Sequence, residues 1–475
     1  MPRWMLADRL RKASGHVLVA LAFSIPLSNA LTSLLVMAFL AMVLSGLVAG
    51  SWSGRWEAVW RHPVSRASLA LYAAVLLCAL WSEGPAEHVG GQLARNFSLL
   101  LLPLFGLALQ EPPWARRCLL AFSAAMLLTL GLSLGHGLWG LTGGGPWVLP
   151  YKGHGDAIFH MHITHNVLMS LAVLLWLGCV LAQQGLPARW RCGLLVLAGV
   201  GVFNIFWMVP GRTGYATLLA VLLTLVLLHC PPRWRLPGAL AIVLLCGAAL
   251  GLSDAVQDRA DRTWREILAF GGADSNQRGD VNLADHRLAI WREAVEVIQQ
   301  SPWLGHGTGS YRTAFCASAQ PADMCQYGGG KHPHNQLLFA AIEGGLLLAV
   351  CYLAWVIALA RTLWRRRHAG VIGVMGAGLW WAWMAYSMVD TPLQLLTERH
   401  LFPLLFALVL FAPALAEGKA PVPAVDPEAQ PPTRQAPRHP VNRLLSAAAP
   451  TNGRSDPAAG AARSMRPGPP GCPRT

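Results

Sequence analysis

The chain has 475 residues, of which 54% are hydrophobic and only 13% are charged. This composition argues against an ordinary soluble protein and predicts an all-α, polytopic membrane protein. The formal net charge of +14 does not indicate a nucleic-acid partner, because most of the basic residues flank apolar segments or lie near the C-terminus. No small-residue cleavage pattern follows the first apolar run, so we expect a retained anchor and not a signal peptide.

Apolar segments separated by polar breaks recur between residues 16 and 416. A bilayer core of about 30 Å requires roughly 20 apolar residues per helix. We therefore expect about twelve transmembrane helices, of which the first, second and fourth are short. Their approximate positions are 16–31, 33–49, 67–81, 97–109, 117–139, 163–183, 193–209, 213–229, 236–252, 334–360, 371–389 and 400–416.

These spans divide the chain into four regions. Residues 1–252 form an N-terminal transmembrane bundle of about nine spans, and residues 334–416 supply about three more. Between them, residues 253–333 are polar and of mixed charge, which predicts one large external loop. Residues 417–475 are rich in Pro and Ala and cannot bury enough apolar surface to fold, so we expect a disordered tail.

The orientation follows from Lys and Arg, which are retained on the cytoplasmic side near the ends of spans. Basic residues occur at alternate connections, and the opposite short loops carry only isolated ones such as Arg95 and Arg212. Both termini are therefore expected to be cytoplasmic and the large loop periplasmic. The basic groups are Arg3 to Lys12, Arg55 to Arg66, Arg116 and Arg117, Arg189 and Arg191, Arg233 and Arg235, and Arg361 to Arg367.

A histidine cluster precedes the sixth predicted span. It comprises His160, His162 and His165, and the last two share a helical face, so the cluster could ligate a metal ion. No acidic or Cys partner is nearby in the sequence. We therefore prefer a polar vestibule wall or a contact to a substrate, a role that Asn166 could share.

The predicted external loop contains an amphipathic helix over residues 283–300. Its apolar residues Leu288, Trp291, Val295 and Ile298 recur at helical spacing. After Ser301-Pro302, three glycines in five residues, with His306 among them, predict a tight turn. Cys316 and Cys325 are the two cysteines of this loop, and an oxidising periplasm would allow a disulfide between them. Two free thiols are the alternative.

A second group of imidazoles lies where this loop meets an apolar helix. His332 and Pro333 directly precede the tenth span, and His334 and Asn335 begin it. The ordinary pKa of His, about 6.5, allows it to accept a proton near neutral pH. This segment is the best candidate for a catalytic base at the membrane surface.

Several of these motifs together resemble the O-antigen ligase and polymerase superfamily. The resemblance covers roughly residues 200–350. A further motif, Gly211 to Gly214, resembles the arginine-containing motif of that family, which usually has Ser where this chain has Gly211. The other motifs are Arg287 with Trp291, Pro302 to Gly307, His334-Asn335, and Gly344-Gly345.

The resemblance implies an inverting glycosyltransferase that needs no metal or other cofactor and uses a glycan on undecaprenyl diphosphate as donor. It implies that His334 is the general base and that Arg212 and Arg287 bind the diphosphate, because a guanidinium pairs with two phosphate oxygens at once. His332, Asn335, His306, His165 and Asn166 are possible lining residues. The expected acceptor is lipid A-core at the periplasmic face of the bacterial inner membrane.

Three other functions stay open on the sequence. An O-antigen polymerase would extend the glycan on its lipid carrier. A protein O-oligosaccharyltransferase would transfer the glycan to Ser or Thr of a pilin-like acceptor. A transporter or flippase for lipid-linked glycans would use the same basic residues for binding only, and would form no bond.

Overall fold

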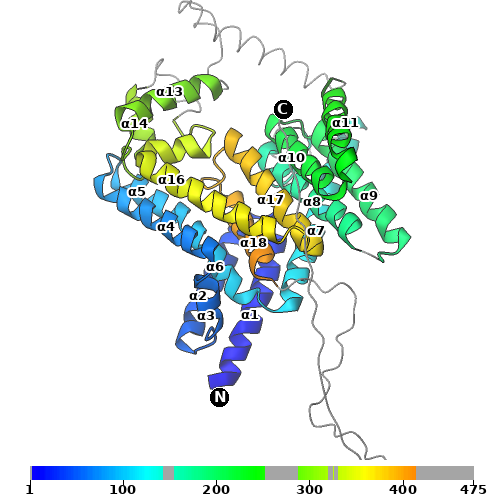
Figure 1. Cartoon of the computed structure of the whole chain (residues 1–475), viewed down its shortest axis with the longest axis horizontal. Coiled ribbons are helices and arrows are strands. Elements are labelled where there is room, and N and C mark those ends of the chain that lie inside the picture. The colour runs from blue at the N-terminus through cyan, green and yellow to red at the C-terminus, as the bar shows by residue number, and fades with distance from the viewer. Residues whose placement is uncertain are drawn as a thin grey trace, which may run out of the picture. The chain divides into compact units, whose positions relative to one another are not determined.

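The computed structural model describes residues 3–142, 155–183, 185–251, 287–318, 325 and 330–412. These residues form helices and connections without any strand, as the sequence predicts (Figure 1). The predicted tail and most of the predicted loop 253–333 lie outside the described residues.

The helices follow one another along the chain in three groups. The first comprises α1 (Arg3–Ser24), α2 (Asn29–Val48), α3 (Arg55–Trp60), α4 (Pro63–Cys78), the 3-10 helix η1 (Ala79–Trp81), α5 (Ala86–Asn96), α6 (Ser98–Ala108) and α7 (Pro112–Leu141). The second comprises α8 (His162–Ala182), α9 (Ala188–Phe203), the π-helical turn η2 (Asn204–Met208), α10 (Arg212–His229) and α11 (Pro232–Gly251). The third comprises α13 (Arg287–Gln300), α14 (Tyr311–Ser318), α16 (Gln336–Arg365), α17 (Gly370–Val389) and α18 (Leu396–Phe411).

All twelve predicted spans coincide with helices, but only nine helices of the described residues are long and apolar enough to cross a membrane. The nine are α2, α4 with η1, α7, α8, α9 with η2, α10, α11, α16 and α17. The other three are limited by length or charge. Helices α6 and α18 have 11 and 16 residues, and the first half of α1 carries five charged side chains.

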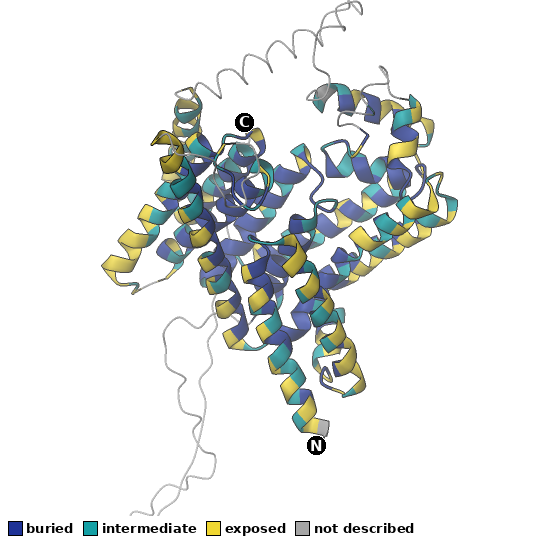
Figure 2. Cartoon of the chain, turned by 180° about the vertical axis from the view of Figure 1, so that it is seen from behind, coloured by how far each residue is buried: buried dark blue, intermediate teal, exposed yellow. Residues whose placement is uncertain are grey.

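Helices α8, α17 and α18 are among the most buried helices of the apolar core. Helix α16 packs against α4 and α17, and α10 packs against α17 and α8. The buried Trp383 of α17 contacts Phe402 of α18 edge-to-face. By contrast, α11 has no buried residue and exposes Leu236, Leu240 and Leu244. Figure 2 shows this difference between a buried interior and exposed outer helices, and an apolar outer surface suits contact with lipid.

A kink in α16 joins the membrane helices to the connection between α13 and α14. Gly344 and Gly345 have non-helical backbone angles, and Gly345 has φ 57° and ψ −149°. The carbonyls of Ile342 and Glu343 therefore lose helical partners and accept hydrogen bonds from the N–H groups of His306 and Gly307, at 2.9 and 2.8 Å. The predicted glycine turn is thus a backbone connector that inserts into the kink.

The predicted amphipathic helix is α13, which begins at Arg287; residues 283–286 lie outside the described residues. The predicted apolar face is wrong in part, because Val295 is exposed and the buried residues are Ile290, Ala294 and Val297. They pack on aromatic residues of α14 and on α16. The presence of two neighbouring apolar stripes on one short helix explains the error, since only the tertiary contact selects between them.

The connections predicted to be cytoplasmic contact one another at one end of the bundle. Arg55, which begins α3, pairs with Glu111 at 2.7 Å, and Arg11 of α1 donates to the carbonyl of Ser51 at 3.5 Å. Arg366, after α16, donates to the carbonyl of Ala412 at 2.9 Å. Figure 1 shows α13 and α14 at the end opposite to α3 and the start of α1.

Candidate functional site

Two imidazoles and one carboxylate meet at the end of the bundle that carries α13. His332 and His334 lie in the connection before α16, and Asp390 directly follows α17. Their Nδ1 atoms lie 3.6 and 3.5 Å from Oδ1 of Asp390, and the two rings are 4.4 Å apart. Asp390 is buried, whereas both imidazoles are partly exposed. This arrangement leaves each ring an Nε2 atom for a ligand.

The backbone of His334 makes this convergence possible. Side chains in a regular extended segment alternate between two sides, so residues two positions apart point to the same side. A turn between them changes these directions. His334 has φ 50°, one of two non-glycine residues with positive φ in the described chain. Such left-handed backbone is uncommon outside glycine and concentrates at functional sites. Here it places both rings against the same carboxylate.

Asn335 has a structural role and does not join the imidazole pair. Its Oδ1 accepts hydrogen bonds from the N–H groups of Leu337 and Leu338, so it caps the N-terminus of α16. Its Nδ2 donates to the carbonyl of Met388 at 3.3 Å. Asn335 thereby fixes the connection that carries His332 and His334, here called the histidine connection, against the end of α17. Met388 lies two residues before Asp390.

The surroundings of the cluster lower the pKa of both His332 and Asp390, which gives the two groups different charge states at neutral pH. Burial lowers the pKa of His332 to about 4; the Asp390 carboxylate opposes this shift, while the charges of His334 and Arg287 add to it. Burial raises the pKa of Asp390, but its contacts with His334, His332 and the N–H of Thr391 together outweigh burial, so the pKa lies below the usual 3.8. At neutral pH the cluster thus holds a neutral His332 beside an ionised Asp390.

The two predicted arginines are brought to the same neighbourhood. Arg287 begins α13, and its Nη2 lies 3.5 Å from Oγ1 of Thr213, the residue after Arg212. Trp291, one turn further along α13, donates from Nε1 to the carbonyl of Pro333 at 2.9 Å. Helix α13 therefore joins the start of α10 to the histidine connection, although these segments are more than 100 positions apart in the sequence.

A buried polar network holds the turn that precedes Arg212. Nδ2 of Asn166 donates to the carbonyl of Val209 at 2.8 Å, and Nε2 of His165 contacts Oδ1 of Asn204 at 2.9 Å. A Cβ on Gly211 would lie 3.1 Å from Nδ2 of Asn166. Glycine in place of the usual Ser thus allows the close approach of Asn166. His165 and Asn166 support the arginine turn, and the lining role expected of them stays a prediction.

The remaining predicted histidines have partners away from Asp390. Nε2 of His160 contacts the carbonyl of Ile25 at 3.1 Å. Nδ1 of His306 contacts Oε2 of Glu83 at 2.8 Å, and its Nε2 contacts the carbonyl of Val297 at 3.2 Å. His306 therefore connects η1–α5 to α13. Neither residue joins the group at Asp390, and the lining role expected of them on the sequence stays a prediction.

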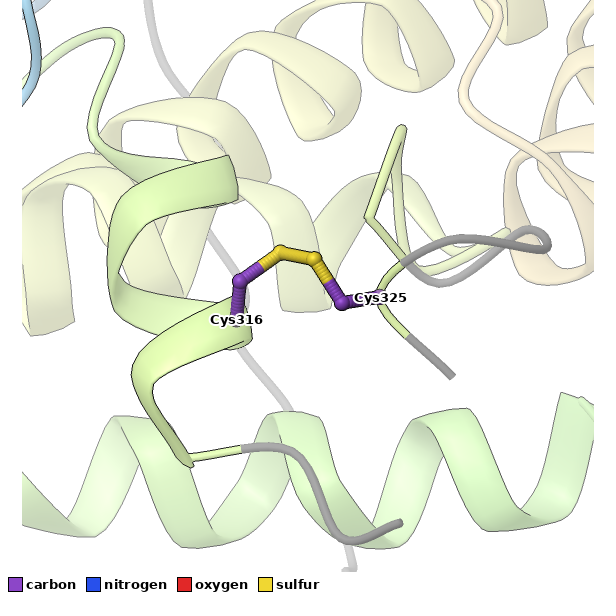
Figure 3. Close-up of a disulfide and its surroundings, with 2 residues drawn as sticks. All are labelled: Cys316 and Cys325. Carbon is purple, nitrogen blue, oxygen red and sulfur yellow. A yellow bond between two sulfur atoms is a disulfide. The ribbon is translucent and has the colours of Figure 1, made fainter. Parts of the chain in front are cut away.

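Cys316 and Cys325 form a disulfide with a Cα–Cα distance of 5.1 Å (Figure 3). It closes a short loop between α14 and the histidine connection.

Metal ligation has a different candidate from the one the sequence suggested. Within the described residues, the one group of three suitable side chains is His332, His334 and Asp390, whose ligand atoms lie within 4.8 Å of one another.

Asp390 is the functional candidate that the sequence reasoning missed. Its signal was present, because it is an acidic residue directly after an apolar span at the predicted external end. The histidine and arginine motifs predicted a site within residues 200–350, and Asp390 lies outside that segment. Only the packing of α17 beside the start of α16 brings it to the imidazoles.

The fold and this site define a multi-pass membrane protein with a histidine–carboxylate cluster beside arginines at one end of its helix bundle. A model of the O-antigen ligase family matches residues 193–353, which include Arg212, Arg287 and both imidazoles. This match supports membership of the chain in the O-antigen ligase and polymerase superfamily, and with it a glycosyltransferase-like enzyme that acts on lipid-linked glycans. No curated protein matches the chain.

Proposed function

We propose that the chain is an inverting, metal-independent glycosyltransferase of lipopolysaccharide biosynthesis. It ligates a glycan carried on undecaprenyl diphosphate to lipid A-core at the periplasmic face of the inner membrane. The observation that carries this proposal is the placement of His334 against a buried carboxylate beside Arg287 and the start of α10. A base and diphosphate ligands at one end of a membrane bundle suit a lipid-linked donor.

In this mechanism His334 activates the acceptor. The carboxylate of Asp390 lies 3.5 Å from Nδ1 of His334 and favours the tautomer that keeps its proton on Nδ1, which leaves Nε2 to accept the hydroxyl proton. The hydroxyl oxygen bonds to the anomeric carbon while the bond from that carbon to the diphosphate oxygen breaks. Attack from the side opposite to the leaving group inverts the anomeric configuration, and the proton stays on His334. Asp390 then stabilises the imidazolium by charge.

The arginines stabilise the leaving group. Negative charge accumulates on undecaprenyl diphosphate as the glycosidic bond breaks, and prearranged cations lower the energy of that transition state. Arg212 begins α10 and Arg287 contacts its neighbour Thr213, so the two residues lie at the same place in the fold, and we assign both to one diphosphate. A helix N-terminus adds a further partial positive charge at this place.

The topology supports a periplasmic reaction. The basic connections contact one another at the end opposite to α13, and basic connections are retained in the cytoplasm. The disulfide near the histidine connection suits an oxidising compartment. These two independent features both support a site on the periplasmic side.

Transfer by the purified protein tests the proposal. We expect lipid-linked glycan and lipid A-core, incubated with the protein and EDTA, to yield glycosylated lipid A-core and free undecaprenyl diphosphate. Glycan elongation on the lipid carrier would identify a polymerase instead, and a glycosylated pilin a protein oligosaccharyltransferase. Movement of the donor across vesicles without bond formation would identify a transporter. A deletion strain that makes rough lipopolysaccharide and accumulates lipid-linked polymer would agree with ligation.

A further inference from the structure

A cavity of about 350 Å³ lies beside the cluster of His332, His334 and Asp390. Helix α5, the start of α14, the histidine connection and the connection before α18 line it. Its volume is in the range of ligand pockets, roughly 300–1,000 Å³. His332 is part of the lining, whereas His334, Arg212 and Arg287 are not. The cavity therefore meets the proposed donor site at His332 and is separate from it.

Polar side chains of the lining lack partners. Nε2 of Gln92, Nε2 of Gln394 and Nδ1 of His88 are buried nitrogen atoms without a hydrogen-bond partner in the part of the chain that the structure describes. An unpaired buried donor costs roughly 1–3 kcal/mol, so such groups are normally paired. The lining is thus polar, but these three nitrogen atoms are not exposed to the cavity, and Nδ1 of His88 donates or accepts according to its tautomer.

The charge of the lining indicates the class of ligand. Arg95, Arg312 and Lys331 line the cavity. The two carboxylates of the lining are Glu87 at the exposed rim and Glu343, whose Oε1 accepts the N–H of Gly309 at 2.9 Å. Arg399 lies close enough to Arg95 for their charges to interact. Cations outnumber anions, and guanidinium groups favour phosphate oxygens.

We propose that this cavity binds a phosphorylated sugar of the acceptor and presents an adjacent hydroxyl to the histidine cluster. The assignment to the acceptor depends on the proposed transfer reaction, because Arg212 and Arg287 are then occupied by the donor diphosphate. Arg95 and Arg312 bind the phosphate, and the polar side chains of Gln92, Gln394 and His88 in the lining favour a sugar over an apolar ligand. The position of His332 between the two sites brings the acceptor hydroxyl to His334.

The test uses the full-length protein in nanodiscs and the variants Arg95→Gln and Arg312→Gln. Transfer rates are measured against the concentration of lipid A-core, of the same glycolipid after phosphatase treatment, and of the donor. A lost charge-assisted contact is typically worth about tenfold or more in binding. We expect KM for the phosphorylated acceptor to rise about tenfold, while KM for the donor and for the dephosphorylated acceptor stays unchanged. Arg312→Lys should restore only part of the loss, because it keeps the charge but loses the planar pair of N–H donors.

Arg292→Gln is the matched control, because Arg292 is exposed on α13, pairs with Glu296 and does not line the cavity. An equal change of KM for both acceptor forms, or a change for the donor, would overturn the proposal. Binding of phosphorylated glycolipid without donor is measured in parallel. Arginine-dependent binding without transfer would refute ligation but keep the phosphosugar site. Normal transfer with unchanged KM would refute the site and keep ligation.

Discussion

At the scale of single residues, the His334 imidazole combines an exposed ring edge, a buried carboxylate neighbour and left-handed backbone. Each feature alone has an ordinary structural explanation. Their combination at the start of α16, beside Arg287, supports a base that is held in one orientation. Three predictions follow from individual side chains of this cluster.

Loss of the base should abolish transfer. We expect His334→Asn to lower the rate about 10²- to 10⁴-fold, because general-base catalysis is lost. Asn tolerates the left-handed backbone that Ala does not favour, so the fold should persist. Asp390→Asn should lower the rate less, since the imidazole remains. Initial rates and gel-filtration profiles check both variants, and a wild-type rate for His334→Asn would remove His334 as the base.

Lysine should not replace either arginine. Arg212→Lys and Arg287→Lys keep the charge but lose the planar pair of N–H donors that binds a diphosphate. We expect each variant to lose at least about tenfold in transfer rate at equal protein level. Arg292→Lys, an exposed change on α13, should have no effect. Full activity in both site variants would mean that these residues serve topology or structure alone.

Acid should destabilise the protein through His332. Its pKa is about 4 in the fold and about 6.5 in the unfolded chain, so the unfolded state takes up the proton first. The free energy of unfolding therefore decreases as the pH falls from about 6.5 to 4, by at most about 3 kcal/mol from this residue. His332→Gln should flatten that part of the Tm profile in detergent. An unchanged slope would show that His332 does not titrate this way.

At the scale of elements, the kink of α16 and the glycine turn after α13 form one unit. The turn supplies N–H groups to carbonyls that the kink frees. This exchange positions α13, and with it Arg287, relative to the histidine connection. The site thus depends on a backbone contact between segments that the sequence presents as a loop and a membrane span.

Gly345→Ala should disrupt this unit. The backbone angles of Gly345 are accessible essentially to glycine alone, and a Cβ there would collide with the backbone of Trp303. We expect a loss of stability of about 1–3 kcal/mol, measured as a lower Tm, together with reduced transfer. Gly247→Ala on α11, where the Cβ meets open space, is the control. Equal Tm values for the two variants would argue against a rigid kink.

At the scale of the whole molecule, the bundle has one end with basic connections and another with the candidate site. A reporter fused after Ala416 should therefore be cytoplasmic, and one inserted near Asp274 should be periplasmic. The physical reason is the retention of Lys and Arg in the cytoplasm. Activity of alkaline phosphatase and fluorescence of a cytoplasmic reporter check the two positions. The reverse result would place the site on the cytoplasmic face.

The sequence by itself determined the all-helical membrane class and the approximate positions of the helices, because apolar runs of sufficient length leave few alternatives in a bilayer. It also predicted a role for His334, Arg212 and Arg287 through their local motifs, and that role stays a prediction. Only the tertiary structure decided which neighbours these residues have. Asp390, the structural roles of His160 and His306, and the cavity beside His332 result from packing between segments that are distant in the chain. Residue periodicity describes each helix separately, whereas a site depends on how helices meet.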